Sequence, residues 1–336
     1  MSIINKINQN SSTYIIAEIG DNHLGQLNLA EKMIKAASSS GANAVKFQTF
    51  VPEEIVFKNS KDYDLIKNIR LKKEEYIKLK KISKHYKVDF FSTPFDPDSF
   101  KLLESIRVSH YKIASCDLTN FILLNLISKT RKPVILSTGM ANTKEIEKSF
   151  NFLKKKKIKT FLLHCIALYP TDSNKVNLGF IDTLKNIAGW KVGFSDHTKG
   201  IDAAALAVCK GAKIIEKHFT IDNKLPGADN ELSLNPRNMR KFVDKIRETE
   251  VMIKNFKNDL NRVDGNQKKK FRRYLYAKNN IPKNFRVYEK NLLALRPTRS
   301  LYKQSADVSK FFLVKTNKNI SSRRKNIPII DLFIRR

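Results

Sequence analysis

The chain alternates eight short β-rich runs with stretches that have the apolar spacing of helices. The runs cover residues 14–20, 44–50, 89–95, 110–116, 133–139, 160–166, 192–197 and 213–219. Apolar spacing over 27–40, 74–86 and 122–130 predicts helices between them, and a helix over 238–254 closes the repeat. Eight such units predict a closed (β/α)8 barrel of the TIM type. An open doubly wound sheet is the alternative, but polar residues at the carboxyl end of the runs favour the barrel.

The alternation stops near residue 254, and the rest of the chain has a different character. Residues 255–270 are polar and basic, which is typical of a linker. Residues 271–336 contain β-like runs at 274–277, 292–295 and 311–314 and no long amphipathic helix. We therefore expect a barrel domain over 1–254, a linker over 255–270 and a small β-rich domain over 271–336.

The net charge of +32 does not by itself indicate a nucleic-acid partner, because lysine is spread along the whole chain. Neither a helix-turn-helix nor an RNA-binding aromatic pattern is present, so an anionic substrate is the better explanation. No stretch approaches the ~20 apolar residues of a membrane span, and the N-terminus lacks the apolar centre of a signal peptide. Three cysteines are too few for a disulfide framework, and Cys209 is predicted to be buried. We expect a cytoplasmic protein that binds neither nucleic acid nor membrane.

Two neighbouring runs carry a histidine at their carboxyl end, His197 and His218. The alanine-rich stretch between them, over 200–211, is long enough for one helix. A strand–helix–strand unit places the carboxyl ends of its two parallel strands on one face, where ligands bind in α/β proteins. Two neutral imidazoles there can hold a divalent transition metal. The alternative is two unrelated histidines, one capping a loop and one packed.

Two lysines, Lys46 and Lys112, lie inside β-rich runs. Burying an ammonium group is costly unless it meets an anion. Together with the serines at neighbouring strand ends, the two lysines predict a site for a phosphate or a carboxylate. For each lysine the alternative is a side chain that reaches the surface along its apolar stem.

The strand ends carry a series of motifs in a fixed order. They are Ala17-Glu-Ile-Gly-x-Asn-His, Val45-Lys-Phe-Gln, Ser92-Thr-Pro-Phe-Asp, Lys112-Ile-x-Ser, Leu136-Ser-Thr-Gly-Met, Leu163-His-Cys, Gly193-Phe-Ser-Asp-His-Thr and Glu216-Lys-His-Phe-Thr. The series resembles that of the sialic acid synthases, the N-acetylneuraminate synthase-like enzymes, from about residue 14 to residue 236. Residues 271–336, with Arg272-Arg-Tyr-Leu-Tyr-Ala277 and Leu295-Arg-Pro297, resemble the family's antifreeze-like (SAF) domain, a small β-clip fold.

This resemblance implies a transferase that forms a C–C bond using phosphoenolpyruvate. The enzyme would condense phosphoenolpyruvate with an N-acylated mannosamine-type sugar and release a nine-carbon 2-keto acid and phosphate. The resemblance also implies a domain-swapped homodimer, in which the small domain of one subunit covers the site of the other.

The resemblance assigns a role to each site residue. His197 and His218 would hold a divalent metal, Mn²⁺ before Mg²⁺ or Co²⁺. The residues implied for phosphoenolpyruvate are Lys46, Thr93, Lys112, Ser115, Ser137 and Ser195, and those implied for the sugar are Glu18, Gln48, Tyr169, Asp229 and Arg296. The implied catalytic residues are Asp117, Lys46 and Glu18, and either Asp117 or a metal-bound hydroxide would assist the addition of water.

The chain departs from the family pattern at a few positions. Asp117 stands where a carboxylate one CH₂ longer is usual, Ala167 where Asn or Ser is common, and Ile166 where Thr is common. In the small domain, Thr298-Arg-Ser300 replaces the usual Gly-x-Gly turn. Two alternatives stay open: a synthase for another nonulosonic acid, such as legionaminic or pseudaminic acid, and a catalytically weakened barrel that binds a sugar.

Overall fold

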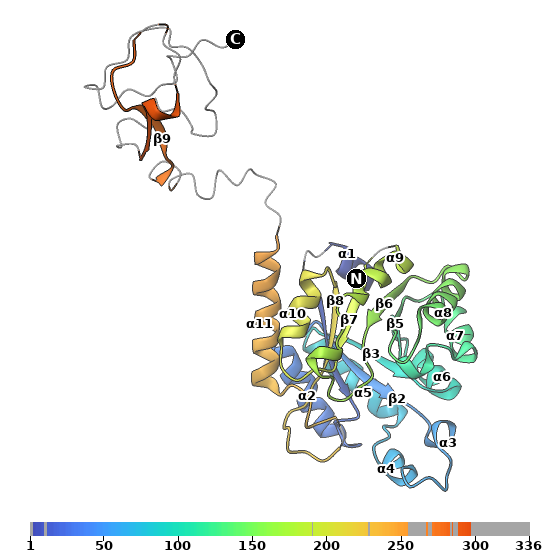
Figure 1. Ribbon diagram of the computed structural model, residues 1–336. Coiled ribbons are helices and arrows are strands. Elements are labelled where there is room, and N and C mark those ends of the chain that lie inside the picture. Colours follow the sequence, from blue (N-terminus) through green and yellow to red (C-terminus); the bar gives the residue numbers. More distant parts are fainter. Residues whose placement is uncertain are drawn as a thin grey trace. The chain divides into compact units, whose positions relative to one another are not determined.

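The computed structural model describes residues 3–9, 12–189, 191–227, 229–254, 267, 271–282, 284 and 288–296. The chain divides into two compact units, Met1–Lys254 and Asn255–Arg336 (Figure 1). The predicted strand 311–314 and nearly all of the predicted linker lie outside the described residues.

The first unit is a parallel barrel. Its strands are β1 (Tyr14–Gly20), β2 (Ala44–Thr49), β3 (Asp89–Pro94), β4 (Tyr111–Ile113), β5 (Val134–Ser137), β6 (Thr160–His164), β7 (Gly193–Asp196) and β8 (Ile214–His218). They follow the order β3-β2-β1-β8-β7-β6-β5-β4, with parallel pairing throughout. The two end strands, β3 and β4, pack beside each other, so the sheet nearly closes on itself. The predicted (β/α)8 barrel is confirmed, and the open sheet is wrong.

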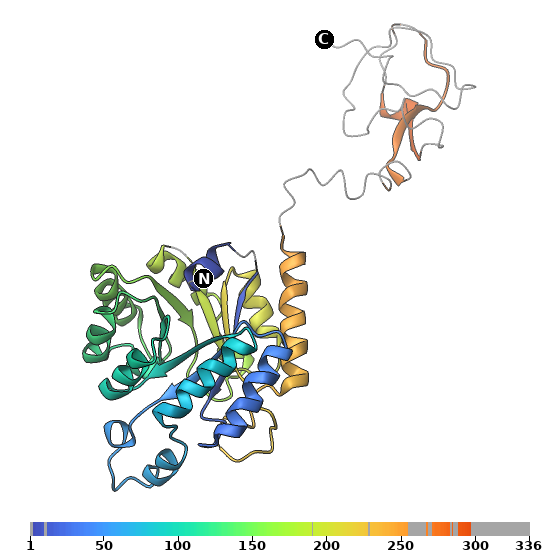
Figure 2. The ribbon, with the colours of Figure 1, turned by 180° about the vertical axis from the view of Figure 1, so that it is seen from behind.

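Helices surround the strands on the outside (Figures 1 and 2). They are α2 (Leu27–Ser39), α5 (Lys73–His85), α6 (Pro97–Ser105), α7 (Phe121–Ser128), α8 (Thr143–Lys155), α9 (Phe180–Ala188), α10 (Asp202–Cys209) and α11 (Pro236–Met252). Local chemistry fixes their starts. Asp96 accepts a hydrogen bond from the Ser99 amide at the start of α6, and Asn142 and Glu145 form a reciprocal capping box at the start of α8.

Shorter elements lie at the two ends of the barrel. The helix α1 (Ile3–Gln9) precedes β1, while α3 (Pro52–Ile55) and α4 (Tyr63–Asn68) form an excursion between β2 and α5. The 3-10 turns η1 (Ser115–Asp117) and η2 (Ser173–Lys175) follow β4 and β6. These excursions follow the carboxyl ends of strands, where a (β/α)8 barrel builds its active site.

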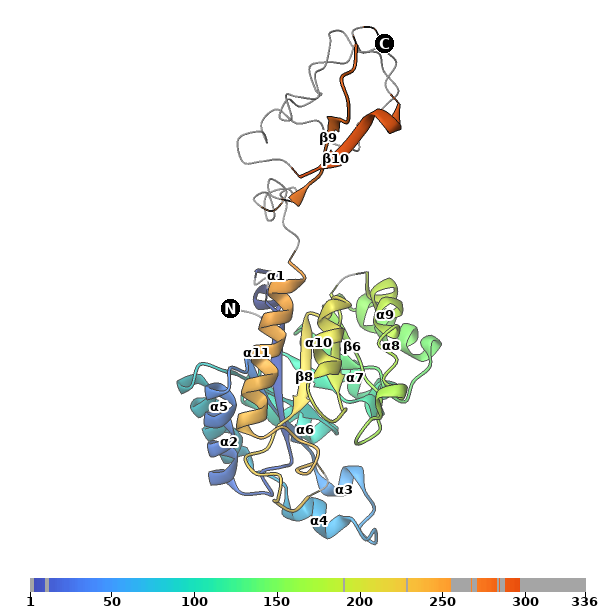
Figure 3. The same ribbon diagram turned by 60° about the vertical axis from the view of Figure 1, so that its left-hand side comes forward.

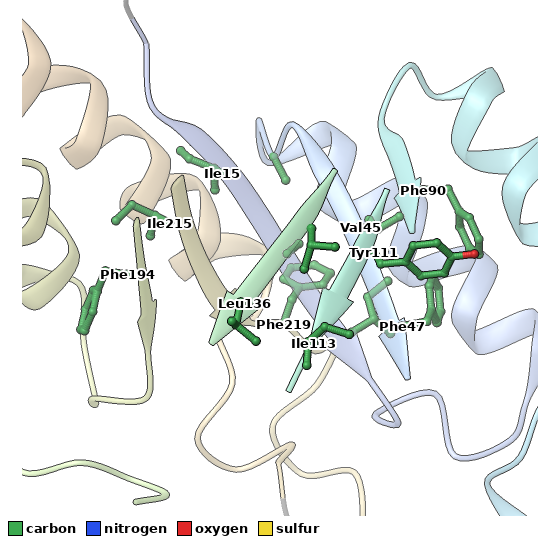
Figure 4. Packing of buried hydrophobic residues seen from close by; sticks show 14 of the residues in the cluster. Ile15, Val45, Phe47, Phe90, Tyr111, Ile113, Leu136, Phe194, Ile215 and Phe219 are labelled. Atoms are coloured by element: carbon green, nitrogen blue, oxygen red, sulfur yellow. The ribbon is translucent and has the colours of Figure 1, made fainter. Parts of the chain in front are cut away.

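Alternation along the strands produces two buried clusters. One face, represented by Ile15 on β1 and Ile215 on β8, packs in the layer between strands and helices (Figure 4). The opposite face, represented by Ile16 and Ile214, packs in a second cluster to which α1 contributes Ile3 and Ile7. Since side chains alternate, the residue that follows Ile16 on the same face of β1 is Glu18. The barrel interior is therefore apolar toward the amino ends of the strands and polar at their carboxyl ends.

The second unit contains an antiparallel hairpin, seen in Figure 3. Its strands are β9 (Tyr274–Ala277) and β10 (Leu292–Leu295). The 3-10 turn η4 (Glu289–Asn291) lies directly before β10. Leu292 pairs with Ala277 and Leu295 with Tyr274. The predicted β-runs at 274–277 and 292–295 are confirmed as strands, while the identity of the unit as a SAF domain stays a prediction.

Two further expectations concern the surface. Within the described ranges, no helix is long and apolar enough to cross a membrane. The prediction for Cys209 was wrong, because this thiol is exposed at the end of α10. It shares the outward face of that helix with Leu206, which is 56% exposed.

Candidate active site

A cavity of about 180 Å³ lies at the carboxyl ends of the barrel strands. It brings together nearly all the barrel residues that the sequence singled out: Glu18, Lys46, Gln48, Thr93, Lys112, Ser115, Ser137, Tyr169, Ser195, His197, His218 and Asp229. A larger hollow, of about 490 Å³, lies between α2 and α5 on the outer surface and is lined by none of these residues. The candidate active site is therefore the smaller cavity inside the rim.

Both strand lysines are buried in this cavity. Lys46 is 4% exposed and Lys112 is 2% exposed, so the alternative of a surface-reaching side chain is wrong. The Nζ atom of Lys46 lies 2.8 Å from Oε1 of Glu18 and donates to the Thr93 hydroxyl at 3.3 Å. The Nζ atom of Lys112 donates to the Ser137 hydroxyl at 2.5 Å and to the backbone carbonyl of Ile113 at 3.0 Å. Strand backbone and hydroxyl groups thus fix the direction of both ammonium groups.

Glu216 is the site residue that sequence reasoning missed. Its two carboxylate oxygens lie 3.8 Å from the Nζ atoms of Lys46 and Lys112, and one of them accepts a hydrogen bond from Ser195 at 3.0 Å. The signal was present, because Glu216 lies two positions before His218 on β8 and so shares its inward face. Glu216 joins the two lysines into one buried charge network.

The network shifts the pKa values of its members. Burial raises the pKa of Glu18 to about 7, with Lys46 opposing and Glu216 adding to the shift. Burial lowers the pKa of Lys112 in spite of Glu216, whereas at Lys46 the two carboxylates outweigh burial and raise the pKa. At Glu216 the two lysines outweigh burial and lower the pKa. Glu18 is therefore the carboxyl group of this network whose pKa lies closest to neutrality.

The two histidines lie side by side at the ends of β7 and β8, with ring centroids 5.5 Å apart. The alternative of two unrelated histidines is wrong. The Nδ1 atom of His197 lies 2.7 Å from the Ile166 carbonyl, which makes Nδ1 the protonated nitrogen and leaves the Nε2 lone pair available. Burial lowers the pKa of His197 to about 4 and that of His218 to about 3. Both rings are therefore neutral at pH 7, which is the form that binds metal.

The donor set around His218 fits a metal ion with open positions. The buried Nδ1 atom of His218 has no hydrogen-bond partner among the described residues, and it lies 3.3 Å from a carboxylate oxygen of Asp229. Within the described part of the chain, no group of three or more His, Cys, Asp or Glu side chains is placed to hold a metal. A pair of imidazoles leaves the remaining coordination positions to water or substrate, as in catalytic sites.

Of the residues implied for the sugar, Glu18, Gln48, Tyr169 and Asp229 line the cavity. Tyr169 is 51% exposed, and its ring lies 4.2 Å from the His197 ring and 5.8 Å from the His218 ring. Gln48 donates to Glu18 at 3.3 Å, and burial raises the pKa of Asp229. An aromatic face beside amide and carboxyl groups provides stacking and hydrogen bonds for a polyhydroxylated ligand.

Asp117 lies outside the lining of the cavity, contrary to its expected catalytic position. The chain turns at η1, and the Asp117 carboxylate accepts a hydrogen bond from the Asn120 side chain at 2.9 Å. Its neighbours Ser115 and Cys116 line the cavity instead. Asp117 is thereby engaged with the segment that leads into α7.

Arg296 belongs to the second unit, and the structure gives it a local partner there. Its guanidinium carbon lies 5.1 Å from the ring centroid of Phe271. One departure from the family pattern, Ile166, lies on the loop after β6. Its backbone carbonyl accepts the hydrogen bond from His197, so a change of side chain at this position leaves that bond in place.

The chain is similar to proteins of one known family. The NeuB family model matches residues 33–258. An N,N'-diacetyllegionaminic acid synthase of Campylobacter jejuni is 36% identical over 306 residues, which are 86% of this chain and 92% of the relative. A pseudaminic acid synthase of the same species is 32% identical over 314 residues, covering 89% of this chain and 91% of the relative.

A solved structure shows the same similarity. The N-acetylneuraminic acid synthetase of Leptospira borgpetersenii, solved with citrate, has a TM-score of 0.73 and 40% sequence identity. The match covers 76% of this chain and 90% of the solved chain. The resemblance to the sialic acid synthases is therefore confirmed, and the chain belongs to the NeuB family.

Proposed function

We propose that the protein condenses phosphoenolpyruvate with an N-acylated amino sugar of the mannosamine type to give a nine-carbon 2-keto acid, a nonulosonic acid. The observation that carries this proposal is the meeting of two buried lysines and two neutral histidines in one cavity. The lysines can form ion pairs with the phosphate and carboxylate groups of phosphoenolpyruvate. The histidines can bind a metal ion that polarises the aldehyde oxygen of the sugar. The names of the relatives support this class of product.

Phosphoenolpyruvate is proposed to bind at the lysine end of the cavity. The two ammonium groups and the hydroxyls of Thr93, Ser137 and Ser195 supply charge-assisted hydrogen bonds to its oxygens. These donors are already held in place by the strands, so little reorganisation accompanies binding. The carboxylates of Glu18 and Glu216 keep the lysines compensated before the anion enters.

We propose that His197 and His218 hold Mn²⁺, with Mg²⁺ or Co²⁺ as alternatives. When bound, such an ion supplies Lewis-acid polarisation of the sugar's aldehyde oxygen. The chain's own residues orient the sugar: Tyr169 covers the histidines, while Gln48 and Asp229 offer hydrogen bonds to hydroxyl groups.

The proposed reaction begins with a bond between the two substrates. Carbon 3 of phosphoenolpyruvate bonds to the aldehyde carbon, and positive charge develops at carbon 2. The aldehyde oxygen takes up a proton and becomes a hydroxyl group, while the water that adds at carbon 2 gives one up. The tetrahedral intermediate then loses phosphate by cleavage of its C–O bond, and the remaining hydroxyl group at carbon 2 becomes the keto group as its proton passes to the phosphate. Lys46 and Lys112 stabilise the phosphate charge throughout. Glu18, with a pKa of about 7 and a position in the lining, is better placed than Asp117 to exchange a proton.

We further propose that the second unit is a SAF domain that acts on the partner subunit's site. The β9–β10 hairpin and the motifs around Arg272 and Arg296 support this assignment. In a two-fold symmetric dimer, Arg296 of each subunit would then contribute to the active site of the other subunit. By its resemblance to the family, Arg296 would contact the N-acyl group of the sugar.

Phosphate release from phosphoenolpyruvate, measured with a panel of sugars and Mn²⁺, tests the proposal. The panel contains N-acetylmannosamine, its 6-phosphate, and diacetylated 6-deoxy sugars of the legionaminic and pseudaminic types. We expect release that depends on one of these sugars and is abolished in Lys46→Met. The matched control is Lys101→Met, because Lys101 forms an exposed pair with Asp98. Sugar binding without phosphate release from any member would instead favour the weakened, sugar-binding barrel.

A further inference from the structure

An ion pair on the side facing away from the cavity joins β7, which ends just before His197, to β8, which ends at His218. Lys217 and Asp196 are register partners on β8 and β7, and the Nζ atom of Lys217 lies 2.9 Å from a carboxylate oxygen of Asp196. The two side chains are 1% and 0% exposed. Their strand neighbours Ser195 and Glu216 line the cavity, so alternation directs Lys217 and Asp196 toward the helical layer.

This pair also holds the backbone on both sides of His197. The Nζ atom of Lys217 donates to the Thr198 carbonyl at 2.5 Å. The second carboxylate oxygen of Asp196 accepts from the Thr198 amide at 2.9 Å and from its hydroxyl at 2.7 Å. His197 is the residue between Asp196 and Thr198, and Lys217 directly precedes His218. The same few contacts therefore restrain both histidine backbones.

Stability alone does not account for this pair. Burying two charges is expensive, and a well-packed apolar pair of similar volume is often as stable or more stable. Geometry supplies a reason, because two imidazoles that share one metal must each bring a nitrogen to within roughly 2.0–2.1 Å of it. A small shift of β7 against β8 would separate the two rings beyond that reach.

We propose that Lys217 and Asp196 are positioning residues that set the spacing of His197 and His218 for a metal ion. The inference rests on the metal assignment of the proposed function. It concerns residues that touch neither substrate nor metal and act through the backbone of β7 and β8. In metal sites, groups that orient the ligands typically affect metal affinity roughly 10- to 100-fold.

The test measures the affinity of the full chain for Mn²⁺ in the absence of substrates, by electron paramagnetic resonance or calorimetry. We expect Lys217→Met to weaken Mn²⁺ binding roughly 10- to 100-fold. The double variant Asp196→Asn/Lys217→Met removes both charges, avoids leaving one buried ion unpaired, and should show the same loss. The control is Lys6→Met, which breaks the Lys6–Asp89 ion pair at the other end of the barrel and should leave Mn²⁺ affinity unchanged.

The decisive outcome is the affinity of the folded double variant. If it binds Mn²⁺ as tightly as the wild-type protein, the positioning role is overturned and the proposed function stands. If neither Lys217 variant folds, Asp196→Asn decides, because it keeps the shape of the side chain and removes its charge from the pair with Lys217. Weaker Mn²⁺ binding by Asp196→Asn supports the inference, and unchanged binding overturns it. A wild-type protein that binds no Mn²⁺ would overturn the metal assignment and this inference with it.

Discussion

Lys112→Met should separate two properties of the buried charge network, stability and anion binding. The Nζ atom of Lys112 lies 3.8 Å from a Glu216 oxygen and bonds to Ser137. Methionine retains much of the lysine stem's volume but offers neither charge nor donor. The change therefore leaves Glu216 with Lys46 as its remaining ammonium partner in the network.

The size of the stability loss depends on two opposing effects. Opposite charges 3.8 Å apart attract by about 4 kcal/mol at an effective dielectric constant of about 20. Removing the buried ammonium also removes its own desolvation cost, which exceeds this attraction, because the pKa of Lys112 is lowered in spite of Glu216. We expect the free energy of unfolding, measured by urea denaturation at pH 7, to fall by only about 1 kcal/mol, because the Ser137 hydroxyl loses its ammonium partner and Glu216 keeps only Lys46.

Phosphoenolpyruvate binding should respond differently from stability. Losing a buried charge partner of the anion weakens binding by about 2–4 kcal/mol, or roughly 30- to 1000-fold. The double variant Lys112→Met/Glu216→Gln no longer buries a poorly compensated carboxylate, so it should regain much of the lost stability. It should not regain phosphoenolpyruvate affinity, because the ammonium group is still missing. Calorimetric titration of both variants gives the two affinities.

Two results would refute this reasoning. Wild-type phosphoenolpyruvate affinity in the double variant would show that Lys112 serves the ion-pair network and not the ligand. Unchanged stability in Lys112→Met would show that Ser137 and Glu216 lose nothing when their ammonium partner is removed. Lys101→Met, at an exposed ion pair, should change neither quantity and serves as the control.

Three further predictions concern metal, pH and subunit exchange. His218→Ala should stay folded but lose Mn²⁺-dependent phosphate release, and full wild-type activity after exhaustive chelation would contradict the metal assignment. Burial lowers the pKa of His110 to about 4 from 6.5, so its neutral form supports folding fully above pH 6.5. That support should fall by up to about 3 kcal/mol as the pH drops to 4, since the unfolded state takes up the proton first. The unfolding free energy of His110→Gln should accordingly vary less with pH over this window, and an equal slope would contradict the burial argument. Finally, inactive His218→Ala and Arg296→Ala chains should regain activity when their subunits exchange. Verified heterodimers that remain inactive, beside a working wild-type control, would exclude a cap that acts in trans.

The barrel could be predicted because its strands and helices have periodic patterns that are local in sequence. The exact residues at which the strands end were harder to predict. The run 110–116 contains only the three-residue strand β4, because Ser115–Asp117 leaves the sheet as a 3-10 turn. That turn is also why Asp117, to which the family resemblance gave a catalytic role, lies outside the cavity lining. One turn of backbone changes the direction of a side chain without leaving a clear trace in hydrophobic spacing.

The site was predictable where strand alternation alone decides which side chains face inward. His197, His218, Lys46 and Lys112 follow that rule. Contacts between strands required the structure, because they depend on register. The pairing of Asp196 with Lys217 is set by how β7 aligns with β8, and a single-sequence pattern does not contain that alignment.

The most direct test of the central claim uses phosphoenolpyruvate labelled with ¹⁸O in the oxygen that bridges carbon 2 and phosphorus. The labelled compound is incubated with the protein, Mn²⁺ and the sugar that gives phosphate release, and both products are analysed by mass spectrometry. The account predicts one nine-carbon 2-keto acid per phosphate, with the label in the phosphate because the C–O bond breaks. Phosphate without the label, or phosphate released without consumption of the sugar, would contradict it.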